Sequence, residues 1–302
     1  AGRGRQSASL CVGSIRGSCG LGGGKLSEET LNYPLFNCSQ HSTLNTQLKQ
    51  MNLCIDQGNS RTKVALMTDE GHIVKNFIYK SFRSSDVERL FALYPITDSI
   101  ISSVINIEPA IVNALHRLSK HFILFDHNTP VPIVNAYDTP ETLGQDRLAA
   151  AVGAVALCPD ENLLIIDAGS AVTYDFVSAQ GRYEGGNIAP GIKMRFVMLH
   201  RMTKKLPQVD LDENELIPLF GTNTHDAIAA GVVRGVVYEV KGYMRTLGER
   251  TEHFQTFLTG GNAPYILNNL RSPNAVEYPV RYEKHLVLIG LNTILCYNKQ
   301  KG

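Results

Sequence analysis

The sequence has no apolar run of the roughly 20 residues that a membrane-spanning helix needs, because Asp, Arg or Gly interrupts its longest apolar stretches. Its charges nearly balance, with a net charge of +1, so the single-sign field of a nucleic-acid binder is missing as well. We therefore expect neither a membrane nor a nucleic-acid partner. Hydrophobic residues make up 43% of the 302 residues, enough for the core of one large or two ordinary domains.

The six cysteines form no CxxC pair and no Cys/His cluster with zinc spacing. Cys54, Cys158 and Cys296 lie in apolar surroundings, where a free cysteine usually acts as a small core residue. The pattern disfavours a disulfide framework and indicates a reducing, cytoplasmic location.

Residues 1–50 differ from the rest of the chain, because they are rich in Gly, Ser and Asn and have few periodic apolar residues. We expect a disordered N-terminal extension without function. The early Arg and Ser residues also allow a targeting peptide, although no amphipathic helix or apolar h-region supports that alternative.

From Met51 onward the pattern is α/β, with apolar strands, turn signals and helical segments. Strands are expected over 52–56, 62–67, 73–80, 99–105, 122–125, 163–167, 171–177 and 254–258. Helices are expected over 86–94, 109–119, 143–157, 224–247 and 286–296. An apolar strand, Asp-x-Gly-[Asn/Ser] and a second strand occur twice, which predicts related domains over 51–160 and 161–302 that face a shared cleft.

The first of these turns has the composition of a phosphate-binding loop. Gly58 lets the backbone approach a ligand closely, while successive N–H groups and polar side chains can hold phosphate oxygens. Lys63 adds a positive charge, and Asp56 can hold Mg²⁺ directly or through water. The candidate nucleotide-binding residues are Asp56, Gln57, Gly58, Asn59, Ser60, Arg61, Thr62 and Lys63. An ordinary hairpin turn is the alternative, and the GxxxxGK[ST] spacing of a P-loop is absent.

The second turn, which runs from Asp167 to Thr173, repeats this chemistry with Gly169 and Ser170. One phosphate-binding turn in each half favours a nucleotide held between two domains.

Gly144, Gln145, Asp146 and Arg147 open an Ala-rich helix. The helix dipole favours an ionised carboxylate in the first turn, so Asp146 is a candidate base for a substrate hydroxyl. Arg147 offers a forked donor for a substrate carboxylate. Alternatively, Asp146 only caps the helix and Arg147 lies on a solvated face.

Two further glycine-rich segments are weaker signals. Residues 185–191 are expected to form a loop before a helix, either close to a ligand or purely structural. Residues 259–262, Thr-Gly-Gly-Asn, follow a strand as adenosine-side loops do. His200, His225 and His253 are isolated, so metal ligation by them is not expected.

Taken together and in order, the motifs resemble the type III pantothenate kinase family over about residues 51–298. The motifs are Asp56-x-Gly58-Asn59-Ser60, Gly144-x-Asp146-Arg147, Asp167-x-Gly169-Ser170-Ala171, Gly185-Gly186-x-Ile188-x-Pro190-Gly191 and Thr259-Gly260-Gly261. The resemblance implies a two-domain actin-like ATPase fold with duplicated mixed sheets. It also implies a homodimer that uses ATP to phosphorylate pantothenate to 4′-phosphopantothenate, the first step of coenzyme A biosynthesis.

The resemblance also implies roles for individual residues. Asp146 is the catalytic base, Ser170 contacts ATP, and Asp167 holds a monovalent cation, K⁺ or NH₄⁺. The residues implied to contact pantothenate are Tyr137, Gly144, Gln145, Asp146, Arg147 and Thr224, the last from the same or the other subunit. Position 170 is Ser where the family usually has Thr, and the hydroxyl is kept.

Two other functions fit parts of the pattern. One is a kinase of the same fold acting on a sugar or another hydroxyl compound, although no sugar-reading cluster of Asp, Asn and Glu is evident. The other is a non-catalytic regulator that keeps the nucleotide cleft, against which the retained Asp146-Arg147 pair argues.

Overall fold

The computed structural model describes residues 50–211, 217–270 and 279–301, all of which belong to the compact unit 46–302. The predicted extension over 1–50 therefore lies almost wholly outside the described residues. Within the described residues, no helix combines the length and the apolar character that crossing a membrane requires.

The first sheet has the strand order β3-β2-β1-β4-β5. Its strands are β1 (Met51–Gln57), β2 (Thr62–Met67), β3 (Ile73–Tyr79), β4 (Ile96–Ser103) and β5 (His121–Leu124). The β1, β2 and β3 strands pair antiparallel, whereas β4 and β5 continue the sheet in parallel from β1. β1 is buried along nearly its whole length, as is expected for a central strand covered on both faces.

The second sheet has the order β11-β10-β7-β8-β9-β6 and repeats this arrangement. Its strands are β6 (Val134–Asn135), β7 (Leu163–Ala168), β8 (Ala171–Ser178), β9 (Arg182–Pro190), β10 (Gln255–Thr259) and β11 (Val280–Tyr282). β7, β8 and β9 pair antiparallel, as β1, β2 and β3 do. β10 and β11 continue the sheet in parallel from β7, as β4 and β5 continue the first sheet from β1. The predicted duplication of mixed sheets is confirmed, whereas the domain boundary at 160/161 stays a prediction.

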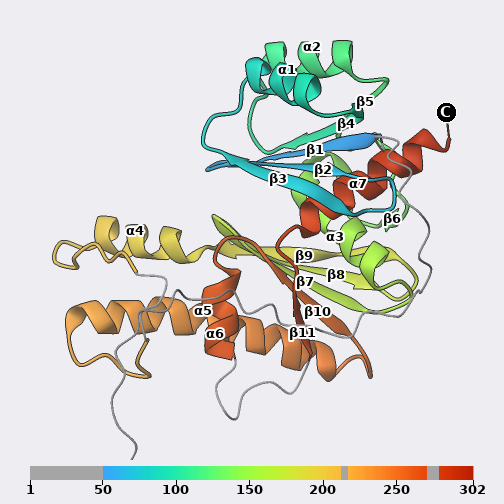
Figure 1. Cartoon of the computed structure of the whole chain (residues 1–302). Coiled ribbons are helices and arrows are strands. Elements are labelled where there is room, and N and C mark those ends of the chain that lie inside the picture. Colours follow the sequence, from blue (N-terminus) through green and yellow to red (C-terminus); the bar gives the residue numbers. More distant parts are fainter. Residues whose placement is uncertain (1–49, 212–216, 271–278, 302) are drawn as a thin grey trace, which may run out of the picture. The chain divides into compact units, whose positions relative to one another are not determined.

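Helices cover both faces of each sheet. α1 (Ser84–Leu93) and α2 (Pro109–Leu118) pack on one face of the first sheet, as Figure 1 shows. α4 (Ile192–Met202), α5 (Thr224–Gly248) and α6 (Ala263–Leu270) belong to the hydrophobic core on one face of the second sheet. α3 (Gln145–Leu157) and α7 (Leu286–Lys299) share one core with the remaining faces of both sheets.

α3 and α7 cross at two glycines. A Cβ on Gly290 would lie 1.8 Å from the Ala149 carbonyl oxygen, and a Cβ on Gly153 would lie 2.4 Å from the Leu286 oxygen. Residues 147–154 of α3 are all buried, which explains why the helix is rich in Ala rather than amphipathic. The crossing fixes α3 directly against α7.

The predicted strands and helices are present, with ends shifted by a few residues, but residues 185–191 are not a loop. Residues 185–190 belong to β9, which pairs with β8, and Gly191 is the N-cap residue of α4. A Cβ on Gly186 would lie 2.3 Å from the Asp175 Oδ1 atom, so a glycine is needed here inside a strand. The short strands β6 and β11 and the 3₁₀ turn Pro140–Thr142 were not expected.

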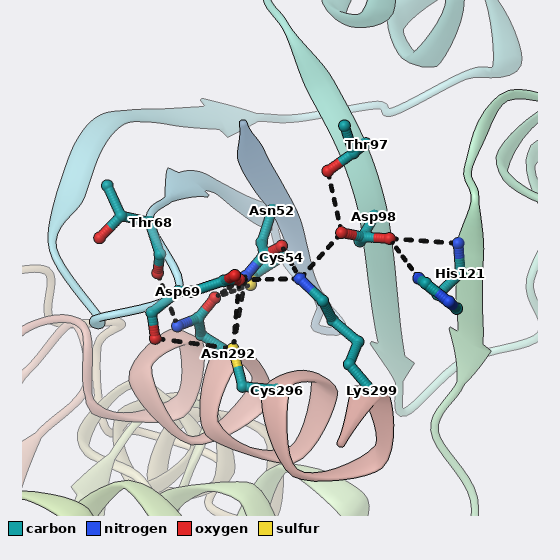
Figure 2. Close-up of polar contacts among 10 residues, drawn as sticks. All are labelled: Asn52, Cys54, Thr68, Asp69, Thr97, Asp98, His121, Asn292, Cys296 and Lys299. Atoms are coloured by element: carbon teal, nitrogen blue, oxygen red, sulfur yellow. Dashed lines mark hydrogen bonds and ion pairs between the residues drawn. The ribbon is translucent and has the colours of Figure 1, made fainter. Parts of the chain in front are cut away.

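A polar network fastens the end of α7 to the first sheet (Figure 2). The Lys299 Nζ atom lies 2.8 Å from Asp69 Oδ1 and 2.9 Å from Asp98 Oδ2. His121 Nδ1 lies 2.7 Å from the other Asp98 oxygen. Cys296 lies beside Asp69, so it is not the apolar core residue that was predicted, whereas Cys54 is fully buried. Cys54, Cys158 and Cys296 are free thiols, and the other three cysteines lie outside the described residues.

Candidate active site

β1 delivers Asp56 to a tight turn. The Gly58 N–H donates to the Arg61 carbonyl at 3.1 Å, and Asp56 pairs in register with Lys63 on β2. The Lys63 Nζ atom lies 3.8 Å from Asp56 Oδ2. Asn59, Ser60 and Arg61 are exposed at the tip, where a ligand can reach them.

Two members of this predicted set point elsewhere. The Gln57 side chain is buried and accepts a hydrogen bond from Ser103 at 3.0 Å. Thr62 is buried at the start of β2. Because both side chains are buried in support of the turn, these residues can contact a nucleotide only through their backbone groups.

The second turn is supported by the Thr-Gly-Gly-Asn segment. The Asn262 side chain donates to the Gly169 carbonyl at 3.0 Å, and its backbone N–H donates to Ala168 at 2.8 Å. Gly260 has φ +93°, and a Cβ there would lie 2.4 Å from Asp167 Oδ1. Only glycine fits this close approach, so the segment supports the turn at Asp167, and its role on the adenosine side of a nucleotide stays a prediction.

The two turns meet. The hydroxyl oxygens of Ser60 and Ser170 lie 3.4 Å apart, although the residues come from different sheets. Burial raises the pKa of Asp56 to about 6, with Lys63 opposing and the charges of Asp146 and Asp167 adding to the rise. Burial likewise raises the pKa of Asp167 to about 6. The carboxylates of Asp56, Asp146 and Asp167 therefore repel one another, and the positive charge of Lys63 opposes the rise in pKa for Asp56 and Asp167.

Asp146 lies in the first turn of α3, where Gly144 is the N-cap residue. A Cβ on Gly144 would lie 2.6 Å from Asp146 Oδ1, so the glycine makes room for the carboxylate. The Arg147 backbone N–H donates to Asp146 Oδ1 at 2.8 Å. Burial nevertheless raises the pKa of Asp146, so the ionised form that the helix dipole was expected to favour is opposed by desolvation.

Arg147 is only 6% exposed, so the alternative that it lies on a solvated face is wrong. Its Nε and Nη2 atoms donate to Asp175 Oδ1 at 2.9 and 2.6 Å. Its guanidinium carbon lies 5.8 Å from the centre of the Tyr137 ring. The structure thus brings Tyr137 and Arg147 together, while their role in a substrate site stays a prediction.

The remaining predicted residues differ in position. Gln145 begins α3, and its side chain donates to the Leu143 carbonyl at 3.1 Å. Thr224 begins α5 and is exposed. Within residues 50–211, 217–270 and 279–301, no hydrogen bond joins Thr224 to Asp146 or Arg147, so its link to the site stays a prediction.

Comparison with known proteins decides the family. The family model for type III pantothenate kinase matches residues 52–246, which is more than half of the chain. The chain belongs to the type III pantothenate kinase family. Its two mixed sheets agree with the duplicated fold that the resemblance to this family implied.

Relatives named type III pantothenate kinase match this family member over most of their length. One from Phocaeicola vulgatus is 43% identical over 248 residues, covering 82% of this chain and 99% of the relative. One from Bacteroides fragilis is 39% identical over 249 residues, covering 82% and 98%. A solved structure of a Baf family transcriptional activator from Campylobacter jejuni has a TM-score of 0.52 at 22% identity, covering 82% and 99%. At that identity the likeness concerns the fold alone.

Asp175 of this type III pantothenate kinase family member was not among the residues predicted from the sequence. The residue lies in β8 between Tyr174 and Phe176, is 1% exposed and pairs with Arg147. A lone carboxylate inside an apolar strand was the available signal, because a buried charge is normally paired. Within the described residues no cluster of three or more His, Cys, Asp or Glu side chains is arranged to hold a metal ion.

Proposed function

We propose that the protein transfers the terminal phosphoryl group of ATP to pantothenate, giving 4′-phosphopantothenate for coenzyme A biosynthesis. Family membership supports the reaction. The observation that carries it to this site is the meeting of the turns at Ser60 and Ser170, with the Asp146 charge acting on both Asp56 and Asp167.

The two turns form the ATP phosphate site. The exposed tip of the first turn, from Asn59 to Arg61, and the hydroxyl of Ser170 offer donors to phosphate oxygens. The Lys63 side chain is 34% exposed, so its ammonium group can leave Asp56 and pair with a phosphate. Phosphoryl transfer needs mainly alignment and neutralisation of charge, which such donors supply.

A cation fits this site. Asp56 is 8% exposed and has a raised pKa, so its ionised form lacks full compensation. Mg²⁺ typically binds through one or two carboxylates together with substrate phosphates and water, so no larger acidic cluster is required. When bound, Mg²⁺ neutralises phosphate charge, and Asp56 would hold it directly or through water.

The acceptor site is built around the start of α3. Asp146 orients the primary hydroxyl of pantothenate and takes its proton, and its raised pKa makes it a stronger base. Tyr137, Gly144, Gln145, Arg147 and Thr224 form the remainder of the proposed pantothenate site.

We assign Asp167 to a monovalent cation, K⁺ or NH₄⁺. Asp167 pairs in register with Thr173 across β7 and β8, so the two side chains share a face of the sheet. The Thr173 hydroxyl is buried and has no hydrogen-bond partner within the described residues. An oxygen without a partner next to a buried carboxylate suits a cation.

A homodimer is part of the proposal. Met194, Met198 and Met202 recur every fourth residue of α4 and are 45%, 46% and 74% exposed. Phe220 is 82% exposed. Exposed apolar side chains in a stripe suit contact with a second copy. The free thiols of Cys54, Cys158 and Cys296 fit the predicted cytoplasmic location.

The experiment is release of ADP from MgATP with pantothenate as acceptor, in KCl and in NaCl of equal ionic strength. The proposal predicts turnover that needs pantothenate and is stimulated by K⁺. No ADP release with any pantothenate concentration would contradict it and favour a regulator, whereas release only with a sugar would favour another kinase of this fold.

A further inference from the structure

Asp175 joins the residues that the proposed acceptor site draws from separate parts of the chain. It accepts three hydrogen bonds on one oxygen, Oδ1. Two come from Arg147 at 2.9 and 2.6 Å, and one comes from the Tyr183 hydroxyl at 2.7 Å. Asp175, Arg147 and Tyr183 are 1%, 6% and 0% exposed, so the cluster is buried.

Tyr137 belongs to the same cluster. Its ring centre lies 6.2 Å from that of Tyr183 and 5.8 Å from the Arg147 guanidinium carbon. Arg147 and Tyr137 reach the cluster from α3 and from the segment after β6, respectively. Asp175 therefore fixes Arg147 and Tyr183 directly, and Tyr137 packs against both of these side chains.

The glycine in β9 is explained by this cluster. A Cβ on Gly186 would lie 2.3 Å from Asp175 Oδ1 and 2.7 Å from Arg147 Nη2. The strand thus has no side chain at the point where the ion pair passes. The glycine-rich motif shapes the acceptor side of the site rather than a loop.

The pairing leaves part of Arg147 available. A guanidinium has five N–H donors, and only the Nε and Nη2 atoms donate to Asp175. Asp175 Oδ2 is buried and has no hydrogen-bond partner within the described residues, so the carboxylate is held by one oxygen alone. The Arg195–Glu239 pair of the same chain is different, because its two bonds of 2.7 Å use both carboxylate oxygens.

We propose that Asp175 is a positioning residue for pantothenate: it orients Arg147 directly and Tyr137 through Arg147 and Tyr183, so that both side chains face the acceptor. This inference rests on the proposed function. Asp175 itself is buried and acts through its neighbours. Arg147 would contact parts of the acceptor that do not react. Losing its orientation therefore weakens binding of the acceptor equally in the ground state and in the transition state, which raises KM and leaves kcat nearly unchanged.

The first test measures pantothenate kinetics for Asp175→Asn, Arg147→Gln and the double variant. Charge-assisted hydrogen bonds contribute about 1.5–3 kcal/mol, so Asp175→Asn should raise the KM for pantothenate about 10-fold or more. The KM for ATP should change less than about 2-fold. The double variant should lose much less kcat/KM than the product of the two single losses, because both substitutions remove the contribution of Arg147 and only that of Tyr137 is additional.

A second pair of variants separates positioning from stability. Tyr183→Phe removes one hydroxyl that donates to Asp175, and Tyr174→Phe removes a buried hydroxyl that donates to Glu239 at 3.1 Å on the other face of β8. Tyr183→Phe should raise the KM for pantothenate about 3-fold, as a neutral hydrogen bond does, while Tyr174→Phe leaves it unchanged. This comparison decides the matter if Asp175→Asn does not fold.

Several results would overturn the inference. Asp175→Asn that folds and keeps the wild-type KM for pantothenate would do so, and so would losses that multiply in the double variant. Equal KM values for the two tyrosine variants would have the same meaning. A wild-type protein that never phosphorylates pantothenate would instead contradict the proposed function, so the two failures are distinguishable.

Discussion

The Ser60 and Ser170 hydroxyl oxygens lie 3.4 Å apart, yet the residues are separated by 110 positions and belong to different sheets. Each serine follows an aspartate and a glycine at the end of an apolar strand. The duplicated sheets therefore bring equivalent turns together. This meeting is the structural basis of the proposed phosphate site, and the predictions below test what surrounds it.

Asp56→Asn should stabilise the ligand-free protein at pH 7. The pKa of Asp56 is raised from 3.8 to about 6, so the folded state binds its proton more tightly than the unfolded state does. Stability therefore falls as pH rises through about 4 to 6, and the cost is complete at pH 7. Removing the carboxylate should increase the free energy of unfolding by at most about 2–3 kcal/mol at pH 7 and by almost nothing at pH 4.

Denaturant unfolding at both pH values checks this prediction, with Glu252→Gln as control because that side chain is 92% exposed. A gain that is equal at both pH values, or a loss at pH 7, would show that Asp56 is not strained by burial of its charge.

Asp167→Ala should remove the dependence on K⁺. If Asp167 holds the monovalent cation, the variant should show the same low rate of ADP release in KCl and in NaCl at constant ionic strength. Removing a protein ligand from a cation site lowers the affinity for the ion, so a smaller fraction of the protein holds K⁺ at a given K⁺ concentration. Unchanged stimulation by K⁺ would assign the cation to other groups.

Lys299→Met should destabilise the protein through the network of Figure 2. Asp98 is 3% exposed and would keep only Thr97 and His121 as side-chain partners. Removing one partner of a buried ion pair costs about 3–5 kcal/mol, and the remaining partners reduce this to about 2–4 kcal/mol.

The matched control for Lys299→Met is Lys301→Met, an exposed lysine near the same end of α7 that contacts Tyr297. Its loss should cost less than about 1 kcal/mol. Urea unfolding midpoints compare the two, and similar losses would contradict a special role for Lys299.

Gly290→Ala should disrupt the crossing of α3 and α7. The new methyl group would lie 1.8 Å from the backbone oxygen of Ala149, which cannot move without shifting α3. Overpacking of this kind costs about 3 kcal/mol or more. Gly242→Ala in α5 is the control, because a Cβ there meets nothing within 4 Å and should stabilise the helix by about 0.5–1 kcal/mol. Equal thermal midpoints for the two variants would contradict the close crossing.

The parts of the site that depend on neighbouring residues could be predicted from the sequence. The turns at Asp56 and Asp167 combine an apolar strand with a nearby glycine, and both are present as expected. Gly186 was misassigned to a loop because its strand is defined by pairing with β8 and by room for Asp175. Neither the pairing with β8 nor the space for Asp175 can be read from the residues next to Gly186 in the sequence.

Arg147 and Asp146 illustrate a second limit. The first turn of α3 was predicted, but not that Arg147 turns inward to a partner 28 residues away. The helix dipole predicted an easily ionised Asp146, yet desolvation raises its pKa. Burial arises only when both sheets enclose the helix, so it could not be judged from the helix sequence.

The turnover of Asp146→Asn tests the central claim most directly. ADP release with saturating pantothenate and MgATP should fall by about 10²–10⁴-fold, the usual contribution of a general base. Nucleotide affinity, measured by titration calorimetry, should stay within about 3-fold of wild type, a change of well under 1 kcal/mol. A variant that keeps most of its turnover would contradict the assignment of Asp146 as the base between the two turns.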